Sequence, residues 1–170
     1  MTDTDDTPGQ RFLRRLYRAE KDNGAQWAAL HSWQPITPNP EVIAVTADAP
    51  DQLWPYWAVV GKMAARYGGL RGGKAPLGAA MRRVGRDGAF GPNNPAATRL
   101  MRSLVDADTI DDLDRALAGI VGALRRDDIA LNWSDLVDTV TAWAQPHSRD
   151  RAREYWARTF YTHTPAPAGH

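Results

Sequence analysis

The arginines in the middle of the chain are the residues whose type and spacing could do chemistry. Between residues 62 and 102 there are nine basic side chains and one acidic side chain, Asp87, which gives this stretch a net charge of +8. Guanidinium groups bind phosphate oxygens in a fork and stack on unpaired bases. Such a surface could hold a polyanion, because field strength follows local rather than total charge. The alternative interpretation is ordinary solvated helix faces in an arginine-rich sequence.

The next stretch has the opposite sign. Residues 103–138 hold nine aspartates and three arginines, a net charge of −6. Over the whole chain, 21 basic and 20 acidic side chains leave a formal charge of +1. This balance excludes a histone-like polybasic chain and an acidic-tail protein. The acidic stretch could instead dock against arginines of a neighbouring subunit.

A glycine-rich segment, residues 68–75, matches part of a phosphate-binding loop. It has the spacing G-x-x-x-x-G-K but places Ala75 where such a loop needs a Ser or Thr hydroxyl for magnesium. A predicted helix, and not a strand, precedes it, and Pro76 follows it. We therefore expect no nucleotide hydrolysis here, but a flexible glycine loop that displays Arg71 and Lys74 to backbone phosphates.

No other pattern indicates an active site or a metal site. There is no cysteine, and the aspartates of residues 106–114 lack the spacing of a calcium loop. They are expected to cap a helix N-terminus. The four histidines do not share a helix face, and no metalloprotease or nucleophile-elbow motif is present. We predict that the protein is not an enzyme and needs no metal or cofactor. The histidines are His31, His147, His163 and His170.

Helical periodicity dominates the first half of the chain. Residues 10–21 read as a helix with Phe12, Leu13, Leu16 and Tyr17 on its apolar side and arginines opposite. A short helix over 25–30 follows, and then a proline-rich connection over 31–50 in which only residues 42–46 could form a strand. A longer helix begins near Leu53 and ends at Gly68-Gly69, and Pro76 opens another that is closed by Gly85.

The second half reads as four further helices. They begin at Asn94-Pro95, at Asp108-Thr109, at a cap on Ser134, and after Pro146. Five tryptophans fall on or beside the apolar stripes, so core packing is expected for them rather than base stacking. These are Trp54, Trp57, Trp133, Trp143 and Trp156.

The fold class that follows is all-α, as two packed helical bundles. We predict an N-terminal bundle over 10–90 and a C-terminal bundle over 91–162, with the seam near residues 85–94 and flexible tails at 1–9 and 163–170. No apolar run reaches the ~18–20 residues of a membrane span, and the acidic start is not a signal peptide. A cytoplasmic protein is expected.

Motifs along the whole chain together resemble the small subunit, CasB, of the type I-E CRISPR Cascade surveillance complex. The resemblance spans residues 10–161 and rests on order and spacing, because no single motif is diagnostic. Pro76 departs from the small polar residue expected before Leu-Gly, and lysines are few. The matching motifs are Phe12-Leu-Arg-Arg-Leu16, Asp22-Asn23-Gly24, Trp54-Pro-Tyr-Trp57, Pro76-Leu-Gly-Ala-Ala-Met81, Thr98-Arg-Leu-Met-Arg102, Leu113-Asp-Arg-Ala-Leu117, Ile129-Ala-Leu-Asn-Trp133 and Trp156-Ala-Arg-Thr-Phe160.

The resemblance implies a non-catalytic subunit that holds the displaced non-target DNA strand and braces the R-loop, while a separate helicase-nuclease cleaves. The implied partners are the other Cascade subunits, the guide RNA, displaced single-stranded DNA and a second copy of the chain. A helical protein–protein adaptor without nucleic-acid contact is the alternative. A continuous basic groove would favour nucleic acid, and scattered arginines the adaptor. The predicted nucleic-acid-binding residues are Arg71, Lys74, Arg82, Arg83, Arg86, Arg99, Arg102, Arg149, Arg151 and Arg153.

Overall fold

The computed structural model describes residues 6–35 and 37–162, and within these ranges the chain forms nine α-helices and one two-stranded hairpin. The all-α prediction is confirmed. The elements are α1 (Pro8–Asp22), α2 (Gly24–Ser32), α3 (Pro40–Val45), α4 (Trp54–Tyr67), α5 (Leu77–Met81), β1 (Gly85–Arg86), β2 (Ala89–Phe90), the 3₁₀ turn η2 (Gly91–Asn93), α6 (Pro95–Val105), α7 (Ile110–Arg126), α8 (Trp133–Ala144) and α9 (Arg149–Tyr161).

Side-chain caps set most of the helix starts. At six helices a Thr or Asn side chain accepts a hydrogen bond from a backbone N–H of the first turn, which satisfies a donor that the helix leaves free. For α8 the cap is Asn132, which accepts from the N–H of Asp135, so the prediction of Ser134 was wrong by two residues. The capping residues are Thr7, Asn23, Asn39, Asn94, Thr109 and Asn132.

Two local predictions in the first half were wrong. Residues 42–46, the only candidate strand there, lie mostly within α3, because Asn39 caps that helix and Pro40 occupies its first turn. Val42 and Val45, three residues apart, are its buried positions. The helix opened by Pro76 is also shorter than expected. It ends at Met81, and residues 85–90 form the antiparallel hairpin β1–β2 instead.

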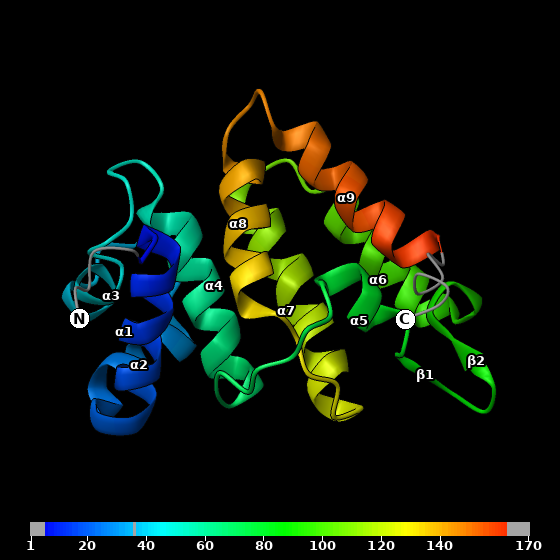
Figure 1. The fold of residues 1–170 in the computed structure, drawn as a ribbon, viewed down its shortest axis with the longest axis horizontal. Coiled ribbons are helices and arrows are strands. Elements are labelled where there is room, and N and C mark those ends of the chain that lie inside the picture. The colour runs from blue at the N-terminus through cyan, green and yellow to red at the C-terminus, as the bar shows by residue number, and fades with distance from the viewer. Residues whose placement is uncertain (1–5, 36, 163–170) are drawn as a thin grey trace.

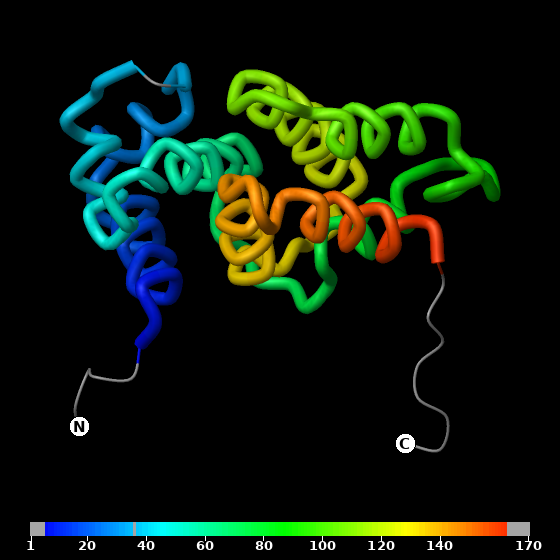
Figure 2. The backbone as a smooth tube through the Cα atoms, turned by 90° about the horizontal axis from the view of Figure 1, so that it is seen from above, coloured from blue at the N-terminus to red at the C-terminus, as the bar shows by residue number. Residues whose placement is uncertain are grey.

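The helices pack around α4. On one side of α4 lie α1, α2 and α3, and on the other it packs against α7 and α8 (Figures 1 and 2). Beyond these, α5, α6 and α9 pack together at the end that carries the hairpin. A close approach joins α5 to α9, since a Cβ on Gly78 would lie 2.1 Å from the Thr159 hydroxyl oxygen.

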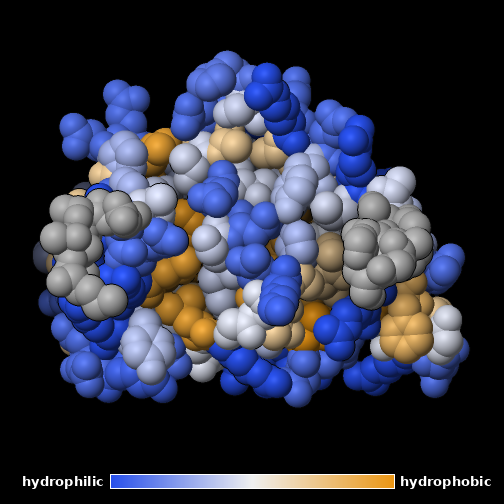
Figure 3. All heavy atoms as spheres, in the orientation of Figure 1, coloured by the Kyte–Doolittle hydropathy of each residue, from blue (hydrophilic) through white to orange (hydrophobic). Residues whose placement is uncertain are grey.

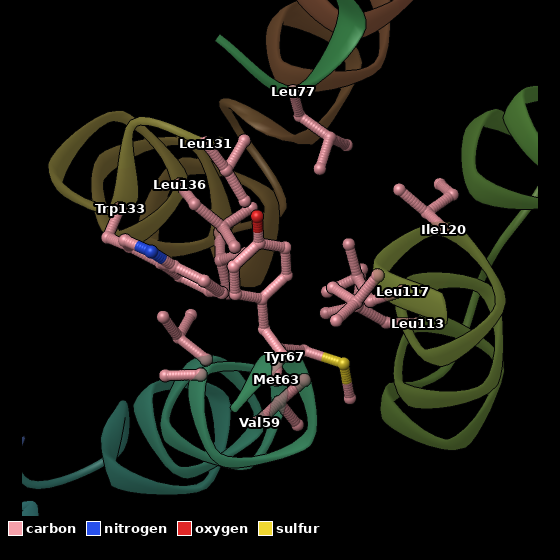
Figure 4. Close-up of a cluster of buried hydrophobic side chains, with 14 of the residues drawn as sticks. Val59, Met63, Tyr67, Leu77, Leu113, Leu117, Ile120, Leu131, Trp133 and Leu136 are labelled. Carbon is pink, nitrogen blue, oxygen red and sulfur yellow. The ribbon is translucent and has the colours of Figure 1, made fainter. Parts of the chain in front are cut away.

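One hydrophobic core runs through the molecule. Figure 4 shows α4 residues Val59, Met63 and Tyr67 facing Leu113 and Leu117 of α7. The tryptophans at 57, 133, 143 and 156 are buried, as predicted, and Trp54 is half-buried. Because a single core includes residues from both predicted bundles, the division at 90/91 stays a prediction. The predicted flexible tail at 163–170 lies outside the described residues, as do residues 1–5.

Candidate nucleic-acid interface

Five of the predicted arginines belong to segments at one end of the molecule, the end that carries the hairpin (Figure 1). We call this surface the arginine end. Its arginines come from the end of α5, from β1 and from α6, and α5 and α6 pack on one another. They are Arg82, Arg83, Arg86, Arg99 and Arg102.

Backbone contacts fix the position of these segments. The hairpin turns at Asp87 and Gly88, whose φ angles of 54° and 82° lie in the left-handed region. Asn94, the cap of α6, donates its side-chain amide to the carbonyl of Ala89 at 3.1 Å. Gly91 lies so close to Arg82 that a Cβ would be 2.8 Å from the Arg82 Cα. The arginines are therefore carried on a fixed support.

No arginine of this end is paired with a carboxylate among the described residues. Arg82 is half-buried and donates to the backbone carbonyl of Thr162 at 2.8 Å, while the other four are exposed. Arg99 and Arg102, one helical turn apart, line a hollow of about 350 Å³ with Pro92 and Thr98. The forks of the four exposed arginines are thus available for an anionic ligand from outside the chain.

The hairpin also exposes an aromatic side chain. Phe90 on β2 is 45% exposed, although a large apolar ring is ordinarily buried. It pairs with Gly85 across the hairpin, next to the pair formed by Arg86 and Ala89. Because neighbouring pairs of a hairpin project to opposite faces, the Phe90 ring and the Arg86 side chain lie on opposite faces of β1–β2. An exposed ring of this kind can stack an unpaired base.

The glycine-rich loop, residues 68–75, was expected to be flexible, but hydrogen bonds hold it to another part of the chain. Gly73 donates its N–H to the carbonyl of Leu131 at 3.1 Å, and the N–H of Asn132 donates to Ala75 at 2.9 Å. These hydrogen bonds fasten the loop to the segment before α8. Arg71 forms an ion pair of 2.6 Å with Asp128, whereas Lys74 is exposed and has no ion pair within the described ranges. Lys74 is the cation that this loop leaves available.

Of the three arginines at the start of α9, two are bound within the chain and one is exposed. Arg149 lies over the ring of Trp143, 4.4 Å from its centroid, and donates to the Trp143 carbonyl at 2.8 Å. Arg153 donates to the carbonyl of Ala107 at 2.6 Å and to the carboxylate of Asp108 at 2.7 Å. Both join α9 to its neighbours. Arg151 is exposed and makes no such contact among the described residues.

The ten predicted residues therefore lie in three places and do not form one cluster. Five gather at the arginine end, two lie on the glycine loop and three on the first turns of α9. Lys62, which contributed to the +8 stretch, is buried and paired with Asp114. A further basic site, outside the ten predicted residues, lies on α1, where Arg14 and Arg18 border a groove beside Tyr17. The only sequence signal for this site is the spacing of Tyr17 and Arg18 three and four residues after Arg14, which places the three side chains on one face of the helix.

Metal binding and membrane crossing receive no support from the described part of the chain. It contains no group of three or more His, Asp or Glu side chains that could hold a metal ion. His31 and His147 are exposed, and the other two histidines lie outside the described residues. Asp111 and Asp112 occupy the first turn of α7, where they face its positive end. No described helix combines the length and apolar character that a membrane span requires.

Comparison with known proteins places the chain among CRISPR-associated proteins. Residues 12–161 match the family described as CRISPR-associated protein Cse2. The fold is similar to that of CasB from Thermus thermophilus, with a TM-score of 0.72 and 20% identity over 92% of this chain and 99% of that one.

Two further structures share the fold. CasB from Thermobifida fusca has a TM-score of 0.66 and 21% identity over 91% of this chain and 96% of that one. A chain of a CRISPR RNA-guided surveillance complex has a TM-score of 0.57 and 18% identity over 91% of each chain. A search of curated protein sequences finds no match.

Proposed function

The chain belongs to the CRISPR-associated Cse2 family, and we propose that it is a non-catalytic structural subunit of a type I-E CRISPR RNA-guided surveillance complex. In this role it binds the displaced non-target DNA strand and stabilises the R-loop. The observation that carries the proposal is the arginine end, where Arg99 and Arg102 line one hollow and none of the five arginines has a carboxylate partner among the described residues. The likeness to a chain of a CRISPR RNA-guided surveillance complex supports the setting.

The mechanism requires contacts to the DNA backbone and no readout of sequence. R-loop formation exchanges one duplex for another of similar stability, so a few protein–backbone contacts can tip the balance. Arg99 and Arg102 present two forks one helical turn apart, and Arg83 and Arg86 extend the charge toward the hairpin. Phe90 can stack a base without regard to its identity. The single strand is thereby kept from re-pairing with the target strand.

The partners follow from the same proposal. The other subunits and the guide RNA hold this chain beside the DNA, so weak backbone contacts become intramolecular and gain a high effective concentration. A second copy of the chain, or another subunit, can dock an arginine against exposed aspartates such as Asp111 and Asp138. Cleavage belongs to a separate helicase-nuclease, and the assembly acts in the cytoplasm.

The experiment uses the assembled complex. Its variant carries Arg99→Glu with Arg102→Glu, and its matched control carries Arg115→Glu with Arg126→Glu, two exposed arginines of α7. Retention of target DNA is measured during a chase with unlabelled competitor, after size-exclusion chromatography has shown normal assembly. We expect the variant to lose the DNA about tenfold faster or more, which corresponds to at least ~1.4 kcal/mol, and the control to retain it.

Equal retention by the two complexes would contradict the proposal and favour the protein–protein adaptor. Loss of assembly in the Arg99/Arg102 variant alone would also assign this surface to a subunit interface. Arg82 is kept unchanged in the test because its hydrogen bond to Thr162 joins α5 to the end of α9.

A further inference from the structure

A groove separates α1 from the glycine loop and the start of α8, away from the arginine end. Its volume is about 430 Å³, in the range of small-molecule sites, and Figure 3 shows hydrophobic surface in the hollow between α1 and α8. We call it the tyrosine groove. The residues that define it are Leu13, Tyr17, Arg18, Leu70, Gly73 and Trp133.

The α1 wall is aromatic and basic. Tyr17 was placed on the apolar side of this helix, but its side chain is 54% exposed, and Phe12 and Leu16 supply buried positions. Arg14 and Arg18 lie beside it, and the ammonium group of Lys21 is 5.5 Å from the centroid of its ring. Arg14 pairs with Asp6, whereas Arg18 makes no ion pair in the described ranges. An exposed ring is thus surrounded by positive charge.

The opposite wall is held in place by the backbone. Gly73 lies against the segment before α8, where a Cβ would be 2.8 Å from the carbonyl carbon of Ala130, so no other residue fits there without a shift. Trp133 on the floor is buried, and its Nε1–H has no acceptor among the described residues. The first turn of α8 adds the positive end of a helix dipole.

The lining combines an apolar floor, an exposed aromatic ring and a cationic rim, and no carboxylate is among the described residues that form it. An apolar protein segment would fill the floor but would leave Arg18 without a partner. A nucleotide satisfies both parts, because its base is a flat apolar ring and its phosphate is an anion. We propose that the tyrosine groove binds one unpaired base of single-stranded DNA, with the base on Tyr17 and the adjoining phosphate at Arg18.

This inference rests on the proposed function, because it needs a single DNA strand to reach the protein. The tyrosine groove and the arginine end differ in the part of the DNA strand that each recognises. The arginine end holds backbone phosphates, so its contribution to binding is the same for a strand without bases. The tyrosine groove holds a base, so its contribution disappears when the bases are removed.

The test measures binding of the full chain to a thymidine oligonucleotide and to an abasic strand of equal length. Tyr17→Ala should weaken binding of the thymidine strand about 5- to 150-fold, the effect of removing ~1–3 kcal/mol of base stacking, and leave abasic binding unchanged. Tyr17→Phe, which keeps the ring, should bind as the parent does. Ile43→Ala is the control, since Ile43 is an exposed apolar residue, 46% accessible, on α3.

Each outcome separates the two proposals. If Tyr17→Ala binds both strands as the parent does, the groove proposal fails; a loss of subunit association in that variant would then show a protein-docking site. If Arg99→Glu with Arg102→Glu weakens both strands equally, the arginine end is supported independently. A parent chain that binds neither strand at low salt would overturn both proposals. Tighter binding of a uridine RNA strand would overturn the assignment to DNA.

Discussion

Lys62 of α4 and Asp114 of α7 form an ion pair inside the helix interface, with Nζ 3.0 Å from Oδ2. Lys62 is only 2% exposed, and the other carboxylate oxygen of Asp114 is buried without a partner among the described residues. Lys62, which was counted in the basic stretch of residues 62–102, therefore joins two core helices and does not contribute to a basic surface.

Removing one member of this pair should be costly. Lys62→Met leaves the Asp114 carboxylate largely buried without its counter-charge, and we expect it to lower the free energy of unfolding by about 3–5 kcal/mol. Lys62→Met combined with Asp114→Leu should recover most of that loss, since neither variant side chain is charged. Denaturant unfolding followed by circular dichroism measures both. A single variant as stable as the parent would show that the pair is unimportant.

Two arginines of α9 should differ in their effect on stability. Arg153→Ala removes hydrogen bonds to Ala107 and Asp108, and we expect a loss of about 1–3 kcal/mol. Arg151→Ala, on the exposed side of the same helix, should change stability by less than about 0.5 kcal/mol. Thermal unfolding of the two variants provides the comparison. If they unfold alike, Arg153 is not a structural residue.

The fold was predictable where local signals agree. Thr109 caps α7 and an apolar stripe follows it, so the sequence alone locates that helix. Segment 40–45 shows the limit, because four nearby prolines indicated a connection although Pro40 lies in the first turn of α3, where its missing N–H costs nothing. The hairpin β1–β2 is too short for alternation to reveal.

The candidate site was predictable only in part, because partners distant in the sequence decide which cations remain available. Arg99 and Arg102 are exposed on α6, whose buried positions Ala97, Met101 and Leu104 follow the helical period. Arg153 is held by residues about one-quarter of the chain away, and no local pattern records this contact. Tyr17 occupies an apolar position of α1, and only the packed structure shows that about half of its side chain is exposed.

A pH effect should follow from Asp135. Burial raises the pKa of this carboxyl above its ordinary value of 3.8, although the Tyr155 hydroxyl donates to it at 2.8 Å and lowers the pKa. Because the unfolded chain then releases this proton at a lower pH, the stability that the group contributes is present below about pH 3.8 and is lost as the pH rises through the folded pKa.

Asp135→Asn keeps an oxygen acceptor for Tyr155 and cannot ionise. We expect its stability relative to the parent to increase between pH 3.5 and pH 7, as measured by denaturant unfolding at each pH. Asp111→Asn, in the exposed first turn of α7, is the control and should show no such gain. A relative stability of Asp135→Asn that falls over this range would contradict the cause assigned to the shift.

The salt dependence of DNA binding tests the central claim most directly. If the arginine end binds backbone phosphates, a plot of log affinity against log salt concentration for a single strand should have a slope of about −3 to −4, from about −0.7 for each of four to six phosphates. Arg99→Gln with Arg102→Gln, which removes two such contacts, should reduce the steepness by about 1.4, whereas Arg115→Gln should leave it unchanged. An affinity that does not depend on salt, or the same slope in the Arg99/Arg102 variant, would contradict binding of the displaced strand at the arginine end.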